Sequence, residues 1–430
     1  MKKIFKLISI FIKVRFFDKW DSREKIEKYQ EKRLKRQMEF FKNNSPYFKE
    51  GKFKEDSFMN KEFMMKNFDE LNTVGVKKDE AFKIAIEAEE NRNFNNKYKN
   101  ISVGLSSGTS GHRGIFITTD EEQAIWAGTI LAKMLPKGFQ RHRLAFFLRA
   151  NNNLYNSINS YFIKLEYFDT FLSPEEHIER LNNYEPTILI APASMLAMLA
   201  KFKEEGMLSI NPKKIISVAE ILEDRDKEYI KRCFSINIIH QVYQATEGFL
   251  AYTCEYGNLH LNEDIIKFEK DYIDERRFYP IITDFKRTSQ PFVKYHLNDI
   301  LVESKEICSC GSALQRIEKI EGRSDDIFKF YNNKGKLISI FPDFIRRCLL
   351  FIEDIREYQV FQTDYNKIEI AVLDVKEEQK NKIRKEFEKI FKNFNIENVE
   401  VDFISYNIDS KVKLKRIINK SNLRKRDEEA

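Results

Sequence analysis

Between residues 143 and 243 the sequence alternates short apolar runs with amphipathic stretches, and this pattern restricts the possible folds more than any other feature. Four runs have the length and composition of buried strands: residues 144–148, 187–191, 214–218 and 236–242. Three stretches between them have helical periodicity: residues 175–184, 193–203 and 224–233. Strands that alternate with helices form βαβ units. We therefore predict an α/β fold with a large, mainly parallel sheet and helices on both of its faces.

The pattern changes after residue 248. Short apolar runs at residues 278–285, 292–295 and 300–303 predict an antiparallel or barrel-like subregion. A last section mixes predicted strands with predicted helices at 343–350 and 377–391, which is typical of a small α+β domain. We therefore expect an N-terminal domain over residues 1–322, including an N-terminal helix at 1–43, and a small C-terminal domain over residues 323–430.

The composition excludes several classes of protein. A hydrophobic fraction of 42% and an aromatic fraction of 13% exclude a disordered chain. The formal net charge is only +7, which excludes a nucleic-acid-binding surface along the whole chain. Five cysteines are too few, and an odd number, for a secreted disulfide framework, so we expect a cytoplasmic protein. The sequence leaves the oligomeric state open, a dimer included.

The positive charge is concentrated at the N-terminus. Residues 1–36 contain 13 Lys or Arg and 5 Asp or Glu, a net charge of +8. The apolar stretch at residues 4–17 is interrupted by Lys6, Lys13 and Arg15 and is too short to span a bilayer. Two interpretations stay open: a helix packed on the body of the protein, or a basic amphipathic helix in peripheral contact with an anionic membrane surface.

The strongest local motif is a loop rich in glycine and hydroxyl side chains. Residues 106–114 (SSGTSGHRG) contain three glycines and four hydroxyl residues, and Arg113 adds positive charge. Such a backbone can direct several N–H groups at one polyphosphate. The loop is not a Walker motif, which needs Lys and Ser or Thr directly after its last glycine. A flexible linker is the alternative, but the apolar runs at 101–105 and 115–118 predict flanking strands.

Four further motifs follow this loop in a specific order: VYQATEG at 242–248, YHLND at 295–299, GRSDD at 322–326 and KLKR at 413–416. Together with the loop, they resemble the adenylate-forming superfamily of acyl-CoA synthetases and related ligases. KYQEKRL at 28–34 and NSPYF at 44–48 are most similar to the phenylacetate-CoA ligase branch and its capsular-polysaccharide-type relatives. The resemblance extends from about residue 24 to about residue 417.

The resemblance implies a role for each matching position. The loop would hold the β- and γ-phosphates of ATP, Tyr243 would stack on the adenine, and Thr246 would contact the α-phosphate. Glu247 would bind Mg²⁺, and Lys413 would reach the substrate carboxylate and the α-phosphate. The implied nucleotide-binding residues are Ser106, Ser107, Gly108, Thr109, Ser110, Gly111, Ala219, Glu220, Tyr243, Asp299 and Arg323.

The implied chemistry is the attack of a substrate carboxylate on the α-phosphorus of ATP, which gives an acyl-adenylate and pyrophosphate. The small domain would then rotate about Asp325, withdraw Lys413 and admit a thiol such as coenzyme A. A carboxylate that caps a turn is the alternative role for Asp325. Two departures from the family pattern are Arg113, where a lysine is common, and Val412, where a glycine is common. Lys411, Lys413 and Lys415 therefore compete for the catalytic role, and we favour Lys413.

Apolar side chains mark the expected acid pocket, which includes Tyr155, Ala245 and Gly248, and they suit an aromatic or medium-chain acid. Two other hypotheses remain open. The acceptor of the acyl group could be an amine or a hydroxyl rather than coenzyme A. The chain could also be a catalytically silent nucleotide-binding protein of envelope polysaccharide or lipid production.

A metal site is indicated by one histidine and three cysteines. Cys254 and His260 are separated by five residues, and Cys308 and Cys310 flank Ser309. Three thiolates and an imidazole are a typical tetrahedral zinc set, and four protein ligands make a structural site. Some relatives in the phenylacetate-ligase branch carry a similar quartet. Ordinary free thiols are the alternative.

Overall fold

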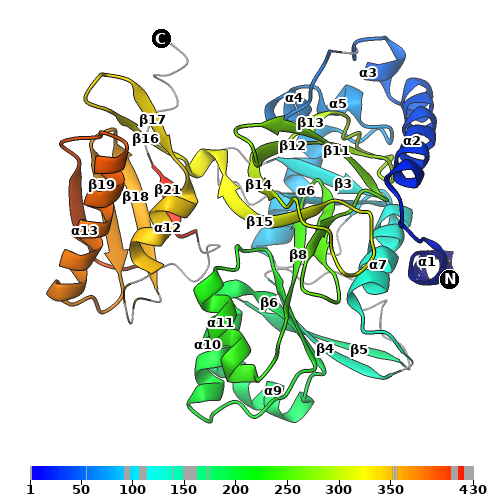
Figure 1. Cartoon of the computed structure of the whole chain (residues 1–430). Helices are drawn as coiled ribbons and strands as arrows, with labels where there is room; N and C mark the ends of the chain where they lie inside the picture. The colour runs from blue at the N-terminus through cyan, green and yellow to red at the C-terminus, as the bar shows by residue number, and fades with distance from the viewer. Residues whose placement is uncertain are drawn as a thin grey trace. The chain divides into compact units, whose positions relative to one another are not determined.

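The computed structural model describes residues 2–54, 56–91, 97–105, 114–138, 140–148, 162–170, 172, 174–350, 352, 355, 357–407 and 415–420. The chain divides into two compact units. The first unit consists of Met1–Leu297 and Leu301–Lys319, and the second of Asn298–Ile300 and Ile320–Ala430. Figure 1 shows the course of the chain through both.

The N-terminal segment is helical, but it is two helices rather than the one expected over residues 1–43. The segments are α1 (Lys2–Ile12), which continues into the π-helical turn η1 (Lys13–Phe17), and α2 (Arg23–Asn44). The first helical segment ends at Phe17, because the backbone of Asp18 is extended. Helix α2 begins after Ser22, whose side chain accepts a hydrogen bond from the N–H of Lys25. Within the described residues, no helix combines the length and apolarity that crossing a membrane requires.

A small antiparallel sheet and four helices follow. The helices are α3 (Pro46–Lys49), α4 (Lys61–Lys66), α5 (Phe68–Leu71) and α6 (Lys78–Glu90). The strands are β1 (Lys97–Tyr98), β2 (Ile101–Leu105) and β3 (Ile115–Thr118), in the order β1-β2-β3. Gly104 of β2 pairs with Phe116 of β3, and its missing side chain leaves room for the Phe116 ring.

The centre of the first unit is a 12-stranded sheet of order β11-β12-β14-β15-β10-β9-β8-β7-β6-β4-β5, in which β13 also pairs with β12. Its parallel part comprises β4 (His142–Leu148), β5 (Ile163–Asp169), β6 (Ile188–Pro192), β7 (Lys214–Val218) and β8 (Ile239–Ala245). The predicted strands are confirmed, and β5 is added at the edge. Residues 163–169 were missed because Lys164 and Glu166 interrupt the apolar run, as an edge strand allows.

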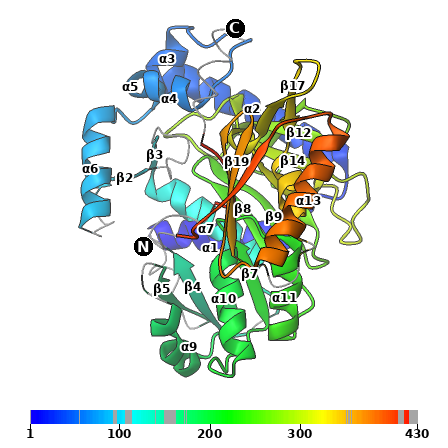
Figure 2. The ribbon, with the colours of Figure 1, turned by 90° about the vertical axis from the view of Figure 1, so that its left-hand side faces the viewer.

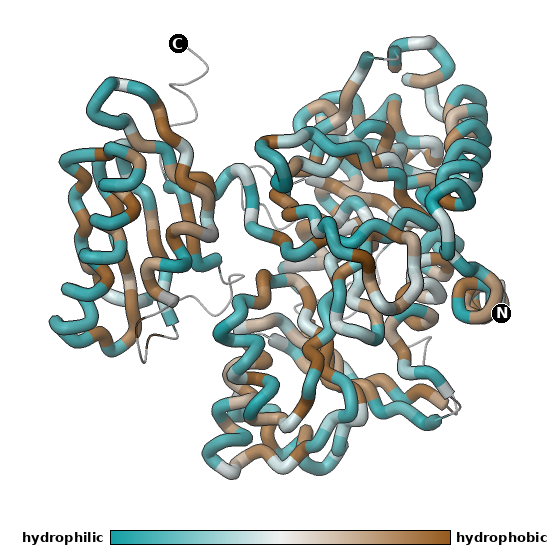
Figure 3. Tube along the Cα trace, viewed as in Figure 1, coloured by the Kyte–Doolittle hydropathy of each residue, from teal (hydrophilic) through white to brown (hydrophobic). Residues whose placement is uncertain are grey.

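Helices pack against this parallel part and, through α7, against the adjacent strand β9. They are α7 (Asp120–Met134), the 3₁₀ turn η2 (Pro174–His177), α9 (Ile178–Tyr184), α10 (Ala193–Glu204) and α11 (Asp224–Phe234). Leu181 of α9, Leu199 of α10 and Ile230 of α11 share one buried core with the strands, and α10 and α11 lie side by side (Figure 2). Figure 3 shows brown, hydrophobic residues along these strands and teal, hydrophilic residues on the helices.

The strands after residue 248 are antiparallel, as predicted, and they extend the same sheet. They are β9 (Gly248–Thr253), β10 (Leu259–Leu261), β11 (Ile266–Tyr272), β12 (Arg277–Asp284), β13 (Tyr295–His296), β14 (Asp299–Glu303) and β15 (Arg316–Arg323). The hairpin of β8 and β9 joins the parallel part to the antiparallel part. The turn of this hairpin therefore lies at the carboxyl end of a parallel strand.

The second unit is α+β. It contains the 3₁₀ turn η3 (Ser324–Asp326), the hairpin β16 (Phe328–Tyr331) and β17 (Leu337–Ile340), and helices α12 (Pro342–Leu350) and α13 (Glu377–Asn393). A four-stranded sheet of order β20-β19-β18-β21 is formed by β18 (Tyr358–Asp364), β19 (Lys367–Val372), β20 (Glu400–Ile404) and β21 (Ile417–Asn419). Ile345 of α12, Phe387 of α13 and Val360 of β18 meet in its core.

Candidate active site

The predicted phosphate loop connects two paired strands. Leu105 at the end of β2 pairs with Ile115 at the start of β3, so the chain leaves and re-enters the sheet at adjacent positions. The loop residues themselves, Ser106, Ser107, Gly108, Thr109, Ser110 and Gly111, lie outside the described residues, as do His112 and Arg113. The predicted flanking strands are confirmed.

The predicted adenine-binding segment begins where β7 ends. Val218 pairs with Val242 of β8, which places Ala219 one residue beyond the pair and beside Tyr243. Ala219 has a φ of +65°, a conformation that costs free energy in a residue with a Cβ and that is concentrated at functional sites. The carboxylate of Glu220 accepts from the N–H of Ser194 at 2.9 Å, at the first turn of α10. The side chain of Glu220 thus binds a backbone N–H in the first turn of α10, while its backbone lies just beyond the end of β7.

Thr246 and Glu247 form the two-residue turn of the β8–β9 hairpin, because Ala245 pairs with Gly248. The hydroxyl of Thr246 donates to Glu247 Oε2 at 2.9 Å, and the hydroxyl of Tyr295 donates to Oε1 at 3.2 Å. Burial and the nearby charge of Glu247 raise the pKa of Tyr295, which keeps it a neutral donor. Glu247 is therefore oriented by two donors while each of its oxygens retains acceptor capacity.

A buried arginine donates a hydrogen bond to the backbone of this turn. Arg287 Nη1 donates to the carbonyl of Thr246 at 2.6 Å, and Nη2 donates to the carbonyl of Ile117 in β3 at 2.9 Å. One guanidinium thus connects the turn to the strand that follows the predicted phosphate loop. Arg287 was not predicted from the sequence, because its partners are 41 and 170 residues away along the chain.

Glu122 supplies the negative charge beside Arg287. Its carboxylate accepts from the N–H of Thr119, Thr288 and Ser289 and from the hydroxyl of Ser289, at 2.5 to 2.7 Å. Burial alone would raise the pKa of Glu122, but these hydrogen bonds and the charge of Arg287 outweigh it and lower the pKa. The capping box of Thr119 and Glu122 is visible in the sequence, whereas its connection to residues 287–289 is not.

A buried carboxyl group also adjoins the turn. A Cβ on Gly248 would lie 3.3 Å from Asp284 Oδ2, so the glycine permits this close approach. Burial raises the pKa of Asp284 to about 6, although the N–H groups of Lys286 and Arg287 donate to it. The group therefore titrates near neutrality.

Three predicted residues of the second unit lie close together. Arg323 Nε donates to Asp299 Oδ1 at 3.3 Å, which joins the two residues predicted near the ribose. Asn298 donates to Asp325 at 3.0 Å through its side chain, and its carbonyl accepts from the N–H of Ser324. Asp325, the predicted hinge residue, lies in the 3₁₀ turn directly after β15.

Of the three candidate catalytic lysines, the structure describes Lys415. Lys411 and Lys413 lie outside the described residues. The ammonium group of Lys415 forms an ion pair with the buried carboxylate of Asp326. Burial raises the pKa of Asp326, and Lys415 opposes this rise. Lys415 is therefore engaged within its own unit.

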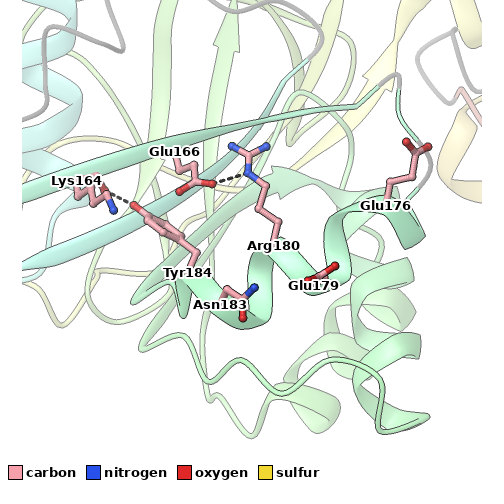
Figure 4. A pocket seen from close by; sticks show the side chains of 7 residues that line it. All are labelled: Lys164, Glu166, Glu176, Glu179, Arg180, Asn183 and Tyr184. Atoms are coloured by element: carbon pink, nitrogen blue, oxygen red, sulfur yellow. Dashed lines mark hydrogen bonds and ion pairs between the residues drawn. The ribbon is translucent and has the colours of Figure 1, made fainter.

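Of the expected acid pocket, Ala245 and Gly248 pair at the turn, and Tyr155 lies outside the described residues. A different pocket opens on the surface between β5 and α9 (Figure 4). It is lined by Lys164, Glu166, Glu176, Glu179, Arg180, Asn183 and Tyr184. Arg180 Nε donates to Glu166 across it, and none of the predicted site residues that the structure describes lines it.

The four predicted metal ligands come together. Cys254, His260, Cys308 and Cys310 place their ligand atoms within 4.8 Å of one another, although up to 56 residues separate them. The Sγ atoms of Cys254 and Cys308 are 3.7 Å apart, and Cys310 Sγ lies 3.5 Å from His260 Nε2. His260 Nδ1 lies 2.9 Å from the carbonyl of Leu314, which can only accept. Nδ1 therefore carries the proton, and Nε2 is free to bind a metal.

One of the thiols, that of Cys308, is electrostatically suited to a cation, whereas burial raises the pKa of Cys310 to about 12. Burial alone would raise the pKa of Cys308, but hydrogen bonds from the N–H of Cys310 and from the side chain of Asn258 help to lower it to about 6. Asn258 donates to Cys308 Sγ at 3.2 Å. A thiolate is the form that binds zinc. The chemistry of the four donors thus fits a tetrahedral zinc ion.

No family model matches the chain, and no curated protein matches it in sequence. Solved structures do share its fold. A 2-hydroxyisobutyryl-CoA ligase in the postadenylation state, in complex with R3-HIB-AMP, has a TM-score of 0.69 at 15% identity over 97% of this chain and 94% of that one.

Two other similar structures cover less of the chain. The anthranilate CoA ligase AuaEII in complex with anthranoyl-AMP has a TM-score of 0.54 at 12% identity, over 73% of this chain and 66% of that one. The amide bond synthetase McbA from Marinactinospora thermotolerans has a TM-score of 0.54 at 10% identity, over 73% and 67%. The chain therefore has the α/β fold of the adenylate-forming ligases.

Proposed function

We propose that the chain activates a carboxylic acid with ATP, giving an acyl-adenylate and pyrophosphate, and then transfers the acyl group to coenzyme A. The observation that carries this proposal is the Thr246–Glu247 turn at the carboxyl end of β8, oriented by Tyr295 and held by Arg287. The carboxyl ends of parallel strands are where open α/β sheets bind ligands. Solved structures of the similar ligases hold acyl adenylates, and a complex of the 2-hydroxyisobutyryl-CoA ligase also holds CoA.

The residue roles are proposed as follows. The loop from Ser106 to Gly111 binds the β- and γ-phosphates, Tyr243 stacks on the adenine beside Ala219 and Glu220, and Asp299 with Arg323 binds the ribose. Thr246 contacts the α-phosphate. Glu247 offers hard carboxylate oxygens to Mg²⁺, which when bound would neutralise charge on the phosphates.

In the first half-reaction, an oxygen of the substrate carboxylate attacks the α-phosphorus, and the bond to pyrophosphate breaks. No protein nucleophile is needed, so positioning and charge stabilisation supply the acceleration. Lys413 offsets the charge that develops in the transition state. In the second half-reaction, the second unit rotates about Asp325, and the thiol of coenzyme A attacks the acyl carbonyl with AMP as leaving group.

The ion pair of Lys415 with Asp326 supports the choice of Lys413. An ammonium group engaged with a buried carboxylate is not available to a substrate without breaking that pair. Lys413 is two residues away along the chain, and it is the position that matches the ligase motif.

We propose an aromatic or medium-chain acid as substrate, as in the phenylacetate-CoA ligase branch. An amine acceptor is the second candidate function, and it is favoured by the likeness to an amide bond synthetase. Product analysis with coenzyme A and with a panel of amines separates these two acceptors. A catalytically silent nucleotide-binding protein would form neither product.

We further propose a structural zinc ion at Cys254, His260, Cys308 and Cys310, supported by the proximity of the four donors and by the free Nε2 of His260. The cytoplasmic location, which is supported by the low cysteine count, is a proposal of the same kind.

Acid-dependent exchange of pyrophosphate into ATP tests the adenylation, using a panel of aryl and fatty acids. We expect at least one acid to support exchange, and Lys413→Ala to lower it about a hundredfold, the usual effect of removing one charge-stabilising group. Lys411→Ala is the matched control and should retain exchange. If no acid supports exchange in the wild-type chain, the proposed function is wrong.

A further inference from the structure

Helix α1 has two apolar faces, and only one of them is covered. The face with Leu7 packs against α7, and Leu7 is 9% exposed. The other face is open to solvent. Its large side chains, continued into η1, are Ile4 (48% exposed), Phe5 (70%), Ile8 (46%), Ile12 (43%), Phe16 (57%) and Phe17 (73%). The positions recur at helical spacing, so they form one stripe along α1.

Although one of its faces is open to solvent, the segment of α1 and η1 is firmly attached to α7. A Cβ on Gly128 of α7 would lie 2.7 Å from the carbonyl of Leu7, so the glycine lets the two helices approach closely. Lys3 pairs with Asp120 and donates to Gln123 at the start of α7. Arg15 donates to the carbonyls of Ala132, Leu135 and Pro136 at its end. Polar contacts thus fix both ends of the segment of α1 and η1. Figures 1 and 2 show α1 beside α7.

Positive charge borders the open face. Residues 1–17 contain five Lys or Arg and no Asp or Glu, and Lys6 and Lys13 next to the stripe are 42% and 52% exposed. Lys6 pairs with Glu121 at the surface, where such a pair exchanges readily with other anions. Lys13 pairs with Asp18, whose side chain is half-buried. An apolar stripe bordered by lysines is the pattern of a helix that lies in a membrane interface.

We propose that the open face of α1 and η1 docks on the surface of an anionic lipid bilayer, with the helix parallel to the membrane plane. Phe5, Phe16 and Phe17 would enter the boundary of the acyl chains, and the lysines would meet the headgroups. A second copy of this chain would fit the open face less well than a bilayer does. A symmetric contact brings each patch against itself, so it would set positive charge against positive charge. The proposal concerns where the protein works, and it is independent of the reaction.

Co-sedimentation of the full chain with vesicles tests this proposal. We expect binding to vesicles of phosphatidylcholine with phosphatidylglycerol, weak binding to phosphatidylcholine alone, and a loss of binding at high salt. The double variant Phe5→Gln/Phe17→Gln should bind the anionic vesicles at least about tenfold more weakly, because each phenyl ring loses its burial. The matched control Ile86→Gln/Met207→Gln removes two exposed apolar side chains elsewhere and should bind like the wild type.

Three results would overturn the proposal: equal binding of the Phe5→Gln/Phe17→Gln variant, equal binding to neutral vesicles, or no binding of the wild type. Analytical ultracentrifugation identifies the competing occupant. If the wild type dimerises and this variant does not, while vesicles are not bound, the face is a contact between two copies. Unchanged thermal melting and pyrophosphate exchange of the variant confirm that its fold and its active site are intact.

Discussion

Arg287 is the residue on which the position of the candidate catalytic turn most directly depends. Replacing it by methionine leaves the carbonyls of Thr246 and Ile117 without their donor and Glu122 without its counter-charge. We expect the free energy of unfolding to fall by about 3–5 kcal/mol, the usual cost of breaking a buried charge pair.

Urea unfolding followed by tryptophan fluorescence measures this change. Arg276→Met is the control, because Arg276 is 44% exposed and its pair with Glu318 lies at the surface. Arg287→Lys should recover only part of the loss, since a lysine cannot span both carbonyls with one planar group. A loss as small as that of the control would contradict the role assigned to Arg287.

Asp284 predicts a specific pH dependence of stability. Its pKa is about 6 in the folded chain against an ordinary value of 3.8, because it is buried. The folded state therefore binds more protons than the unfolded state between these values. The stability that this group contributes is present at low pH and is lost as the pH rises through about 6.

The variant Asp284→Asn removes this dependence. The unfolding free energy of the variant minus that of the wild type should become more positive by about 2 kcal/mol between about pH 4.5 and about pH 7.5. Taking the difference between the two proteins cancels the titration of other groups. A difference that stays constant, or that falls with rising pH, would show that Asp284 ionises normally.

At the level of residues, the sequence identified groups that act through a local motif and missed those that act through distant partners. Thr246 and Glu247 are adjacent, and their motif follows a buried strand, so their place at a strand end was predictable. Arg287 contacts groups on two other strands, and no local pattern distinguishes it from a surface arginine. Asp284 likewise gives no local sign of its burial.

At the level of elements, the Cys/His cluster joins β9, β10 and the segment before β15, and it gives a prediction about metal content. The purified chain should contain about one zinc ion, since four protein ligands complete one tetrahedral site. Cys310→Ser should lose the zinc and unfold at a lower temperature. Mass spectrometry of the metal content and thermal melting measure both effects.

Cys233→Ser is the matched control, because Cys233 lies on α11 and is not one of the four clustered residues. It should retain the zinc. If the wild-type chain, purified without chelator, contains no zinc, the three clustered cysteines are free thiols in a reduced protein. If Cys310→Ser retains the zinc, this cluster is not the zinc site.

The helices and strands were predictable where burial gives the sequence a clear hydrophobic pattern. Strands β4, β6 and β7 lie inside the sheet and contain runs of apolar residues. Strands β9, β10, β16 and β21 were not predicted, and three of these four are short. Strands β5, β11 and β15 were not predicted because charged side chains interrupt their apolar residues. The break between α1 and α2 was missed because helical spacing continues on both sides of residues 18–22.

At the level of the whole molecule, the change from parallel to antiparallel pairing is what creates the candidate site. The β8–β9 hairpin makes this change, and its two-residue turn carries Thr246 and Glu247. The order of strands in the sheet could not be read from the sequence, because pairing is set by contacts between segments far apart in the chain. The alternation of strands and helices was sufficient to predict the α/β class, and the similar solved structures have the same fold.

The central claim is that an oxygen of the substrate carboxylate attacks the α-phosphorus of ATP. The most direct test supplies an acid that supports pyrophosphate exchange, labelled with ¹⁸O in its carboxylate, and analyses the products of thioester formation by mass spectrometry. The account predicts that the AMP carries one ¹⁸O atom from the acid, because the labelled carboxylate oxygen stays on phosphorus when the thiol displaces AMP. Label in inorganic phosphate with formation of ADP, or unlabelled AMP, would contradict it.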